Sequence, residues 1–470
     1  MKPSQRSAFI AGGFSLALFG VLALIAGVHL EHIQGAASAL ALAGLYGGVY
    51  ALSEIVYLRL EKPKTGELLF VSGFMAVMMI ARFVMLDFVT ADYNAFLSGW
   101  VEIFREGGFR MLAEDVGDYN LLYQYVLLLI SKTPLKDLYL IKLLSVFFDY
   151  ALALVMMRAA KTYAGERAGV PALCMVLALP TVLTDGALWS QCDTVYVFFI
   201  ILALLLLEKN HPMGSAASLA VAFAFKLQTI FFFPVVLLGL IHRRYRLRDA
   251  LVFFAAYLAT LLPALVAGRS LIDALMIYAS QSVGQYFARL SYNAPNFYLF
   301  FPMIEFKGTQ GFTLVRYLPG IDAAGVNPYL TEPMMQAIQS AALYACVILT
   351  LLVVIYWLIH YKEITPDMTL GFALFFAIFL PFVMPKIHDR YFFLADMLSV
   401  LYAFRHKNRR FMPLLVIGAS FMCYVPYLMR QNPIDERWLS LMMLLALTIV
   451  SRDLLAGMKR NRALCGEVKA

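Results

Sequence analysis

The chain has 470 residues, of which 62% are hydrophobic and 14% are charged, with a formal net charge of +8 and a mean hydropathy of +0.75. A soluble fold of this length does not need so much apolar surface, and runs of roughly 18 to 22 apolar residues match helices that cross a bilayer core of about 30 Å. Basic loops on the cytoplasmic side account for the positive charge, and nucleic-acid binding is not expected because no basic stripe carries interleaved aromatic residues. The composition therefore predicts an all-α polytopic membrane protein.

We predict about fourteen membrane-spanning helices, the first of which resembles an uncleaved signal anchor because a second apolar run follows it at once. The seventh and eighth are short and could form one broken hairpin. The predicted spans are residues 8–28, 36–58, 67–86, 138–158, 168–184, 190–207, 213–225, 228–241, 248–267, 336–360, 367–384, 391–404, 411–429 and 438–456.

Basic junctions set the expected orientation. With the N-terminus in the cytoplasm, the positive-inside rule places "RLEKPK", "HRRYRLR", "RHKNRR" and "KRNR" on the cytoplasmic side. Every unusual polar cluster then lies in an outer segment, and we expect these clusters to converge on one cavity outside the cytoplasm. The outer segments are residues 87–137, 184–194, 226–228, 268–335 and 385–390.

The first outer segment contains "ADYNAFLSGWVEIFREGGFRMLAEDVGDYNLLYQY". Apolar residues at helical spacing, with charges between them, predict an amphipathic helix that lies on the membrane surface. Clustered carboxylates usually indicate a solvated acidic loop. Asp92 differs because it directly follows a span and precedes the amphipathic helix, where a carboxylate that faces a cavity can act as a general base.

The second polar cluster is "LTDGALWSQCDTVYVFF", which contains Asp185, Trp189, Gln191 and Asp193. Two carboxylates and an amide at a helix junction could bind the hydroxyl groups of a sugar. Helix capping explains the carboxylates equally well, because Asp185 ends one predicted span and Asp193 starts the next. The spacing does not separate these alternatives.

The third cluster, "AFAFKLQTIFFF", places Lys226 and Gln228 in a run that is otherwise apolar. A buried lysine is costly in a membrane, so it should have an anionic partner. The alternative is that the long Lys226 side chain extends to the membrane interface, which would leave it solvated.

The fourth cluster is "KIHDRY". Lys386 and Arg390 are cationic and His388 donates hydrogen bonds in either protonation state, which suits a phosphate or diphosphate. An internal salt bridge through Asp389 is the alternative. A weaker signal, "SYNAPNFYLFFP", could form a sugar-binding lip with Asn293, Asn296, Tyr292 and Phe297, although a loop that re-enters the membrane is the more ordinary interpretation.

One reaction uses a carboxylate base, cations for phosphate, and amides with aromatic side chains for sugar: glycosyl transfer from a polyprenyl-phosphate sugar. The phosphate leaves as a weak base that cations can stabilise, so no carboxylic acid has to protonate it. Glycoside hydrolysis, in contrast, normally requires a second carboxyl group as the acid.

The order of "ADYNAFLSGW", "GDYNLLYQY", "DGALWSQCDT", "KLQ" and "HDRYFF" resembles the GT-C superfamily of membrane glycosyltransferases. The chain is similar to bacterial proteins related to the GPI mannosyltransferase II family and to the dolichyl-phosphate-glucose-dependent glucosyltransferases. The resemblance implies a GT-C-like catalytic core over residues 67–404, with long outer loops 87–137 and 268–335. Residues 1–66 would be two additional N-terminal helices, and residues 405–470 would be C-terminal helices with a cytoplasmic tail.

The resemblance also implies roles for individual residues. Asp92 would be the general base, Asp118 and Tyr119 would shape the acceptor side, and His388 with Arg390 nearby would meet the carrier phosphate. Lys226 and Gln228 would stand near the same donor pocket. Two features depart from the family pattern: Asn120 and the leucines after it replace prolines, and Cys192 lies inside the tryptophan–glutamine motif.

The implied activity is that of an inverting hexosyltransferase in the cytoplasmic membrane, with its active site on the extracytoplasmic side. Its partners would be a polyprenyl-phosphate sugar donor, with mannose favoured by the resemblance, a glycolipid or cell-envelope glycan acceptor, and membrane lipid. No cofactor is required. The acidic first loop could hold a divalent metal, but no ligand spacing demands one, and five widely spaced cysteines predict neither disulfides nor a zinc site.

The competing hypothesis is a lipid-linked oligosaccharide flippase or another secondary transporter. Many spans with charges inside the membrane fit that class, and Asp149 lies in mid-span with Lys142 seven positions before it on the same helix face. These two could instead be an internal pair. Transporters commonly have two matching halves with broken helices in corresponding positions, whereas here the polar groups gather on one face and the halves do not match.

Overall fold

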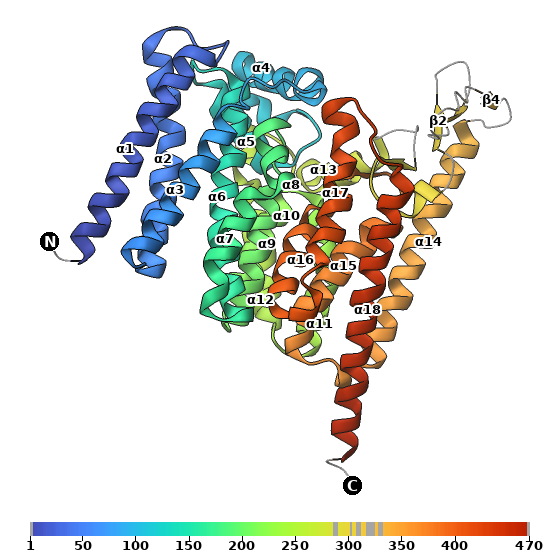
Figure 1. The fold of residues 1–470 in the computed structure, drawn as a ribbon. Helices are drawn as coiled ribbons and strands as arrows, with labels where there is room; N and C mark the ends of the chain where they lie inside the picture. The colour runs from blue at the N-terminus through green and yellow to red at the C-terminus, as the bar shows by residue number, and fades with distance from the viewer. Residues whose placement is uncertain are drawn as a thin grey trace. The chain divides into compact units, whose positions relative to one another are not determined.

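The computed structural model describes residues 3–284, 290–300, 303–306, 312–315, 325–327 and 332–467. Within these residues, nine helices are long and apolar enough to cross a membrane (Figure 1). Two further helical segments, Glu166–Ala178 and Pro180–Leu188, meet at 49° and together would form a tenth span. The prediction of an all-α polytopic membrane protein is confirmed.

The chain divides into two compact units. The first consists of Met1–Leu227 with Leu251–Tyr278, and the second of Gln228–Ala250 with Ala279–Ala470. The predicted catalytic core, residues 67–404, includes parts of both units and stays a prediction.

The first unit is built from helices that are joined by short turns. Its α-helices are α1 (Pro3–His29), α2 (Gly35–Glu61), α3 (Thr65–Phe83), α4 (Ser98–Gly107), α5 (Leu121–Ser131), α6 (Asp137–Ala164), α7 (Gly169–Ala178), α8 (Pro180–Leu183), α9 (Asp193–Glu208) and α10 (Pro212–Phe225), followed by most of α12 (Leu247–Ala267) and of α13 (Leu271–Gly284). Single turns of π-helix at Tyr93–Leu97 and Thr184–Leu188, and of 3₁₀-helix at Gly108–Ala113 and Glu166–Ala168, interrupt the series. Helix α6 contacts α2, α5, α7 and α9, which makes it the central element of this unit.

The boundaries of these helices follow local sequence signals. Helices α8 and α10 both begin with proline, whose missing N–H would have had no partner in the first turn. Helix α6 ends at Ala164, and the next residue, Gly165, has a positive φ of 89° that glycine adopts without strain.

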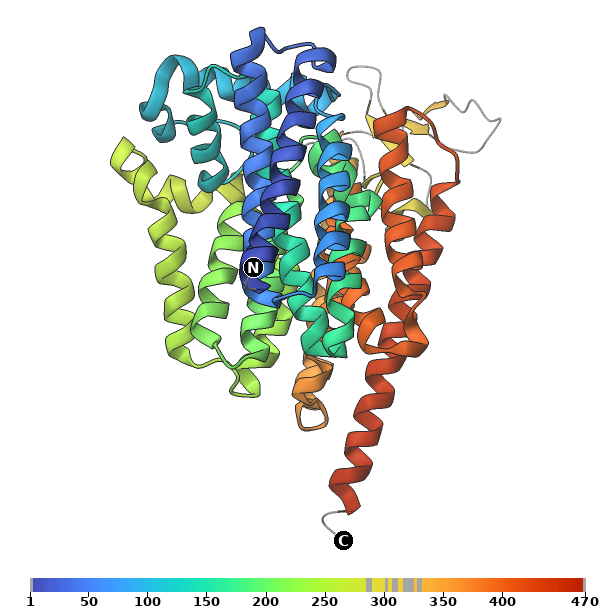
Figure 2. The same ribbon diagram turned by 60° about the vertical axis from the view of Figure 1, so that its left-hand side comes forward.

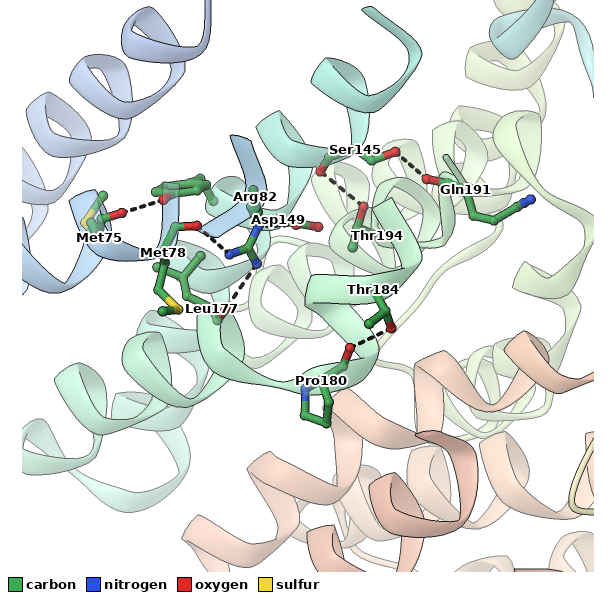
Figure 3. A network of polar contacts seen from close by, with 11 residues as sticks. Met75, Met78, Arg82, Ser145, Asp149, Leu177, Pro180, Thr184, Gln191 and Thr194 are labelled. Carbon is green, nitrogen blue, oxygen red and sulfur yellow. Dashed lines mark hydrogen bonds and ion pairs between the residues drawn. The ribbon is translucent and has the colours of Figure 1, made fainter. Parts of the chain in front are cut away.

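Charged groups inside the first unit hold α3, α6 and α7 together. Arg82 on α3 pairs with Asp149 on α6 at 2.7 Å, and both side chains are completely buried. The same guanidinium donates to the carbonyl oxygens of Met78 at 3.2 Å and Leu177 at 3.0 Å (Figure 3). The hypothesis that Asp149 pairs with Lys142 is therefore wrong, because the third helix supplies a nearer guanidinium.

The predicted amphipathic segment is helical. It consists of the π-turn Tyr93–Leu97, helix α4 and the 3₁₀ turn that follows. Helix α4 packs against α5 (Figure 1). Val101 and Phe104 on α4 are buried, whereas Glu102 and Arg105 are exposed, as the apolar spacing predicted.

The second unit contains α11 (Phe233–Ile241), α14 (Glu332–Ile359), α15 (Thr369–Val383), α16 (Phe393–Arg405), α17 (Met412–Met429) and α18 (Glu436–Glu467). Helices α15, α16, α17 and α18 pack side by side (Figure 2). Single 3₁₀ turns are Leu227–Phe232, which begins at the end of the first unit, and Phe297–Phe300, Tyr361–Glu363, Pro366–Met368, Asp389–Phe392 and Lys407–Arg409.

Two small sheets accompany these helices. Strands β2 (Met303–Phe306), β3 (Phe312–Val315) and β4 (Gly325–Asn327) form an antiparallel sheet within the predicted outer segment 268–335. Strand β1 (Ser291–Tyr292) pairs in parallel with β5 (Ile387–His388), so the loop before β2 is tied to the junction between α15 and α16.

All fourteen predicted spans coincide with helical segments, but the count of about fourteen exceeds the nine or ten of spanning length among the described residues. Helices α9, α10, α11 and α16 have 16, 14, 9 and 13 residues, shorter than the roughly 20 that cross a bilayer core. Helix α16 is buried continuously from Phe393 to Ala403. Its apolar sequence therefore reflects burial against neighbouring helices as well as the membrane.

Candidate active site

The Asp92 carboxylate lies between two side chains of the tryptophan–glutamine motif. Trp189 donates its indole N–H to Asp92 Oδ2 at 2.9 Å, and Gln191 donates its amide N–H to the same oxygen at 3.1 Å. Trp189 is buried, whereas Asp92 is half-buried. The structure thus brings together the first two polar clusters that the sequence singled out.

The backbone before Asp92 is fixed by a buried lysine. Lys142 Nζ on α6 donates to the carbonyl oxygens of Met85 at 3.0 Å, Leu86 at 2.9 Å and Phe88 at 2.7 Å. These carbonyl groups lie just beyond the last residue of α3, where the chain is no longer helical, and a buried ammonium group can donate to three acceptors at once. Lys142 therefore holds the segment between α3 and Asp92, a contact that the sequence analysis missed.

Thr90 connects this segment to the second cluster. Its hydroxyl donates to the carbonyl oxygen of Trp189 at 3.2 Å and accepts from the backbone N–H of Tyr93 at 3.3 Å. The hydroxyl therefore joins the turn that begins after Asp92 to the residue whose indole contacts Asp92. The only sequence signal for Thr90 was its position two residues before Asp92.

The turn that carries Trp189 and Gln191 is pressed against α6. Ser145 on α6 donates its hydroxyl to the carbonyl oxygen of Gln191 (Figure 3). A Cβ atom at Gly186 would lie 2.6 Å from Ser145 Cβ, closer than real Cβ contacts allow. The turn can approach α6 this closely because residue 186 has no side chain.

Gln191 relays contacts from Asp92 to Tyr119. While its amide N–H donates to Asp92, its Oε1 accepts from the Tyr119 hydroxyl at 2.9 Å. With both ends of the amide engaged, the hydrogen-bond network itself assigns the orientation of the side chain.

Lys226 lies over the ring of Tyr119. Its Nζ is 5.5 Å from the centre of the Tyr119 ring and 2.8 Å from Asp193 Oδ1. The Lys226 side chain is 7% exposed and that of Asp193 is completely buried. The expectation that Lys226 has an anionic partner is confirmed. The alternative, in which its side chain extends to a solvated interface, is wrong because the side chain is buried.

The two aspartates of the second cluster have different contacts. Asp185 Oδ2 accepts from the backbone N–H of Asp193 at 3.2 Å, so Asp185 caps the start of α9. Asp193 is the first residue of α9 and holds the Lys226 ammonium group. The capping alternative thus accounts for one of the two carboxylates, and a role for either in binding sugar stays a prediction.

The loop that carries Asp118 and Tyr119 is seated on Trp100. Gly117 has a φ of +73°, and a Cβ atom there would lie 2.4 Å from the Trp100 indole. The centres of the Trp100 and Tyr119 rings are 5.8 Å apart and their planes meet at 67°, while Asp118 is exposed. Glycine is therefore required where this loop crosses the indole.

Two further acidic residues of the first outer segment have structural partners. Asp87 accepts hydrogen bonds from the Tyr139 hydroxyl and, at 3.0 Å, from the backbone N–H of Glu31. Asp115 forms an ion pair with Arg269. Across the described parts of the chain, no three His, Cys, Asp or Glu side chains gather in a way that could hold a metal ion.

The "KIHDRY" cluster lies in the second unit, at the junction between α15 and α16. His388 is on β5, directly opposite Tyr292 on β1, and the two rings stack 4.5 Å apart at an angle of 10°. Burial lowers the pKa of Lys386, whose backbone is in the left-handed region with a φ of 60°. Arg390 Nε is 3.9 Å from Asp389 Oδ1, so the internal salt bridge that was the alternative is present as a long contact.

The "SYNAPNFY" loop is tied to the same junction. Asn296 is buried and accepts from the backbone N–H of Tyr298 at 3.1 Å, while the Tyr298 hydroxyl donates to the carbonyl oxygen of Val383 at 3.0 Å. Phe301 and Pro302, the last residues of the quoted motif, lie outside the described residues. Gln228 is half-buried at the start of the second unit, and its role near the donor pocket stays a prediction.

No family model matches the sequence, and no curated protein matches it. Among solved structures, the chain is similar to the crystal structure of ArnT from Cupriavidus metallidurans bound to undecaprenyl phosphate. The TM-score is 0.47 and the sequence identity 14%, over 84% of this chain and 79% of that chain.

Proposed function

We propose that this protein is an inverting glycosyltransferase of the GT-C type, which moves a hexose from a polyprenyl-phosphate donor to an acceptor hydroxyl at the outer face of the membrane. The observation that carries the proposal is the Asp92 carboxylate, whose Oδ2 accepts hydrogen bonds from Trp189 at 2.9 Å and Gln191 at 3.1 Å. These two neutral donors hold Oδ2 and restrict the orientation of the carboxylate. A carboxylate held in this way is suited to accept a proton.

In the proposed reaction, Asp92 takes the proton of the acceptor hydroxyl while the hydroxyl oxygen forms a bond to the anomeric carbon. The bond between that carbon and the phosphate oxygen breaks, and the electron pair leaves with the polyprenyl phosphate. Attack on the face opposite the phosphate inverts the configuration. Because the phosphate is a weak base, cations can stabilise it and no side chain has to donate a proton to it.

The cations proposed to bind the phosphate are Lys386, His388 and Arg390. Lys226 is a weaker candidate for direct contact with phosphate, because the Asp193 carboxylate already compensates its charge at 2.8 Å. We assign Lys226 to the shape and charge balance of the donor pocket, with Gln228 after it in sequence.

The proposed sugar and acceptor groups are Tyr119, Gln191 and Asp118. Tyr119 is supported by its hydrogen bond to Gln191, which in turn donates to Asp92. Mannose is favoured only by the resemblance to mannosyltransferases, and the acceptor is proposed as a glycolipid or a cell-envelope glycan.

The proposal is tested in membranes supplied with a labelled polyprenyl-phosphate hexose. Asp92→Asn should lower transfer by roughly 10²- to 10⁴-fold, the range that general-base catalysis contributes. Asp367→Asn is a matched control, because this carboxylate is largely exposed, with 67% of its side chain accessible. Full activity of Asp92→Asn would remove Asp92 as the base.

Mass spectrometry of lipids from cells with and without the gene would identify the sugar and the acceptor, because one lipid-linked saccharide should differ by one hexose. A wild-type protein that binds the donor lipid but transfers no sugar to any acceptor would instead favour a transporter.

A further inference from the structure

Two loops of the second unit form one compact structure around His388. Strand β1 pairs with β5 in parallel, with Tyr292 in register with His388. The backbone N–H of Lys386 donates to the carbonyl oxygen of Leu290 at 2.8 Å. Together with the hydrogen bond from the Tyr298 hydroxyl to the carbonyl oxygen of Val383, these contacts fix the histidine against the loop that carries Tyr292.

The orientation of the His388 ring follows from its contact with Tyr292. The two rings are almost parallel, at 10°, with centres 4.5 Å apart. The N–H groups of an imidazole lie in the plane of its ring, so a phenol ring across one face directs these donors away from Tyr292 and along the ring edges. The side chain of Tyr391, whose ring centre is 5.6 Å away, limits the space on another side.

Charged residues flank His388 in the sequence, so the group that stacks on its ring is relevant to the charge of the imidazole. Lys386 and Arg390 stand two positions before and after it, and Asp389 lies between, accepting from the backbone N–H of Arg390 at 2.9 Å. The electron-rich face of a tyrosine ring attracts a cation, so the stacked Tyr292 ring is a favourable neighbour for the charged form of the imidazole.

We infer that Tyr292 is a positioning residue that orients His388 and stabilises its charged form for contact with the phosphate group of a polyprenyl-phosphate lipid. The inference rests on the proposed function for its ligand, and it assigns to Tyr292 a role through its ring face. The phenol hydroxyl is not required for this role, which separates it from sugar binding by the same side chain.

The test compares Tyr292→Leu with Tyr292→Phe, using a polyprenyl phosphate as the binding probe and the labelled hexose donor for kinetics. Tyr292→Leu should weaken binding of the polyprenyl phosphate and raise the KM for the donor about tenfold, within the range of a partly desolvated cation–π contact. The KM for the acceptor should not change. Tyr292→Phe keeps the ring and should behave like the wild type. Phe411→Leu, an exposed aromatic residue of the second unit outside this loop and outside the proposed sites, is the control.

A double-mutant cycle with His388→Ala decides whether Tyr292 acts through His388. If it does, Tyr292→Leu should add almost nothing to the loss caused by His388→Ala, because the partner is already gone. Additive losses, unchanged probe binding in Tyr292→Leu, or weakened probe binding in Tyr292→Phe would each overturn the inference.

The design separates failure of the inference from failure of the proposed function. Probe binding does not depend on turnover, and Asp92→Asn should bind the polyprenyl phosphate normally. A protein that transfers sugar with Asp92 as its base but binds the probe independently of Tyr292 would refute the inference alone. Binding that requires Tyr292, in a protein without transferase activity, would refute the proposed function alone.

Discussion

Trp189 donates its indole N–H to the carboxylate of Asp92, a residue 97 positions earlier in the chain, at 2.9 Å. The indole is buried and the carboxylate is half-buried, so this bond orients the group proposed as the catalytic base. The same oxygen of Asp92 accepts from Gln191, which restricts the carboxylate further.

Trp189→Phe removes the donor while keeping an aromatic ring in the same place. We expect the turnover rate to fall roughly 10- to 100-fold, because a small misplacement of a catalytic group is costly. The measurement is kcat at saturating donor and acceptor. Trp438→Phe is the control, since Trp438 is 64% exposed and lies in the second unit. Equal rates for Trp189→Phe and the wild type would show that the indole N–H does not orient the base.

Lys226→Met should destabilise the protein because it leaves the Asp193 carboxylate buried without its cation. Breaking one partner of a buried pair typically costs about 3–5 kcal/mol. Thermal unfolding in detergent measures the effect, with Lys64→Met as the control because Lys64 is exposed. The double variant Lys226→Met with Asp193→Leu should recover part of the loss. If Lys226→Met unfolds at the same temperature as Lys64→Met, the ion pair does not contribute to stability.

Gly186→Ala tests the close approach between the tryptophan–glutamine turn and α6. The new methyl group would meet Ser145 Cβ at 2.6 Å, so the turn must move outward and carry Trp189 and Gln191 away from Asp92. We expect transfer activity to fall by roughly 10²-fold, the cost of a misplacement of about 1 Å. Gly99→Ala on α4 is the matched control, because a Cβ atom there meets no atom within 4 Å. Similar activities for the two variants would contradict the predicted strain.

Substitutions of the buried Arg82–Asp149 pair test whether these charges stabilise the fold or take part in transport (Figure 3). Asp149→Leu alone leaves a buried guanidinium without its anion. It should lower the free energy of unfolding by about 3–5 kcal/mol, and less folded protein should therefore be found in the membrane. Arg82→Met with Asp149→Leu replaces the pair by apolar side chains and should restore folding. We expect the double variant to keep its transferase activity, measured per folded molecule. A stable double variant without any activity would indicate that these charges participate in function.

The positions of the helices could be predicted because each membrane span depends mainly on its own residues. The segments 8–28, 36–58 and 438–456, for example, correspond closely to α1, α2 and the first part of α18. The segments predicted as spans at α9, α11 and α16 are helical but too short to cross a bilayer. Their apolar residues pack against other helices. Mean hydropathy does not distinguish these two environments.

The polar residues at the helix junctions could also be recognised as candidate site residues from the sequence. Polar groups such as Asp92, Gln191 and Lys226 are expensive in an apolar setting, so their presence identified segments with specific partners. Lys142 shows where this reasoning ended: its charge was noticed, but its partners are three backbone carbonyl groups that no side-chain pattern reveals.

Hydropathy and composition are enough to show that this chain is a helical membrane protein and which of its junctions are polar, because bilayer thickness and hydropathy act on each segment separately. The partners of the polar side chains are known only from the packed helices, which bring together Asp92 with Trp189 and Gln191, Lys226 with Asp193, and Arg82 with Asp149. Partners some 30 to 100 residues apart meet only when helices pack in a particular arrangement. That arrangement depends on the shapes of all the contacting side chains together.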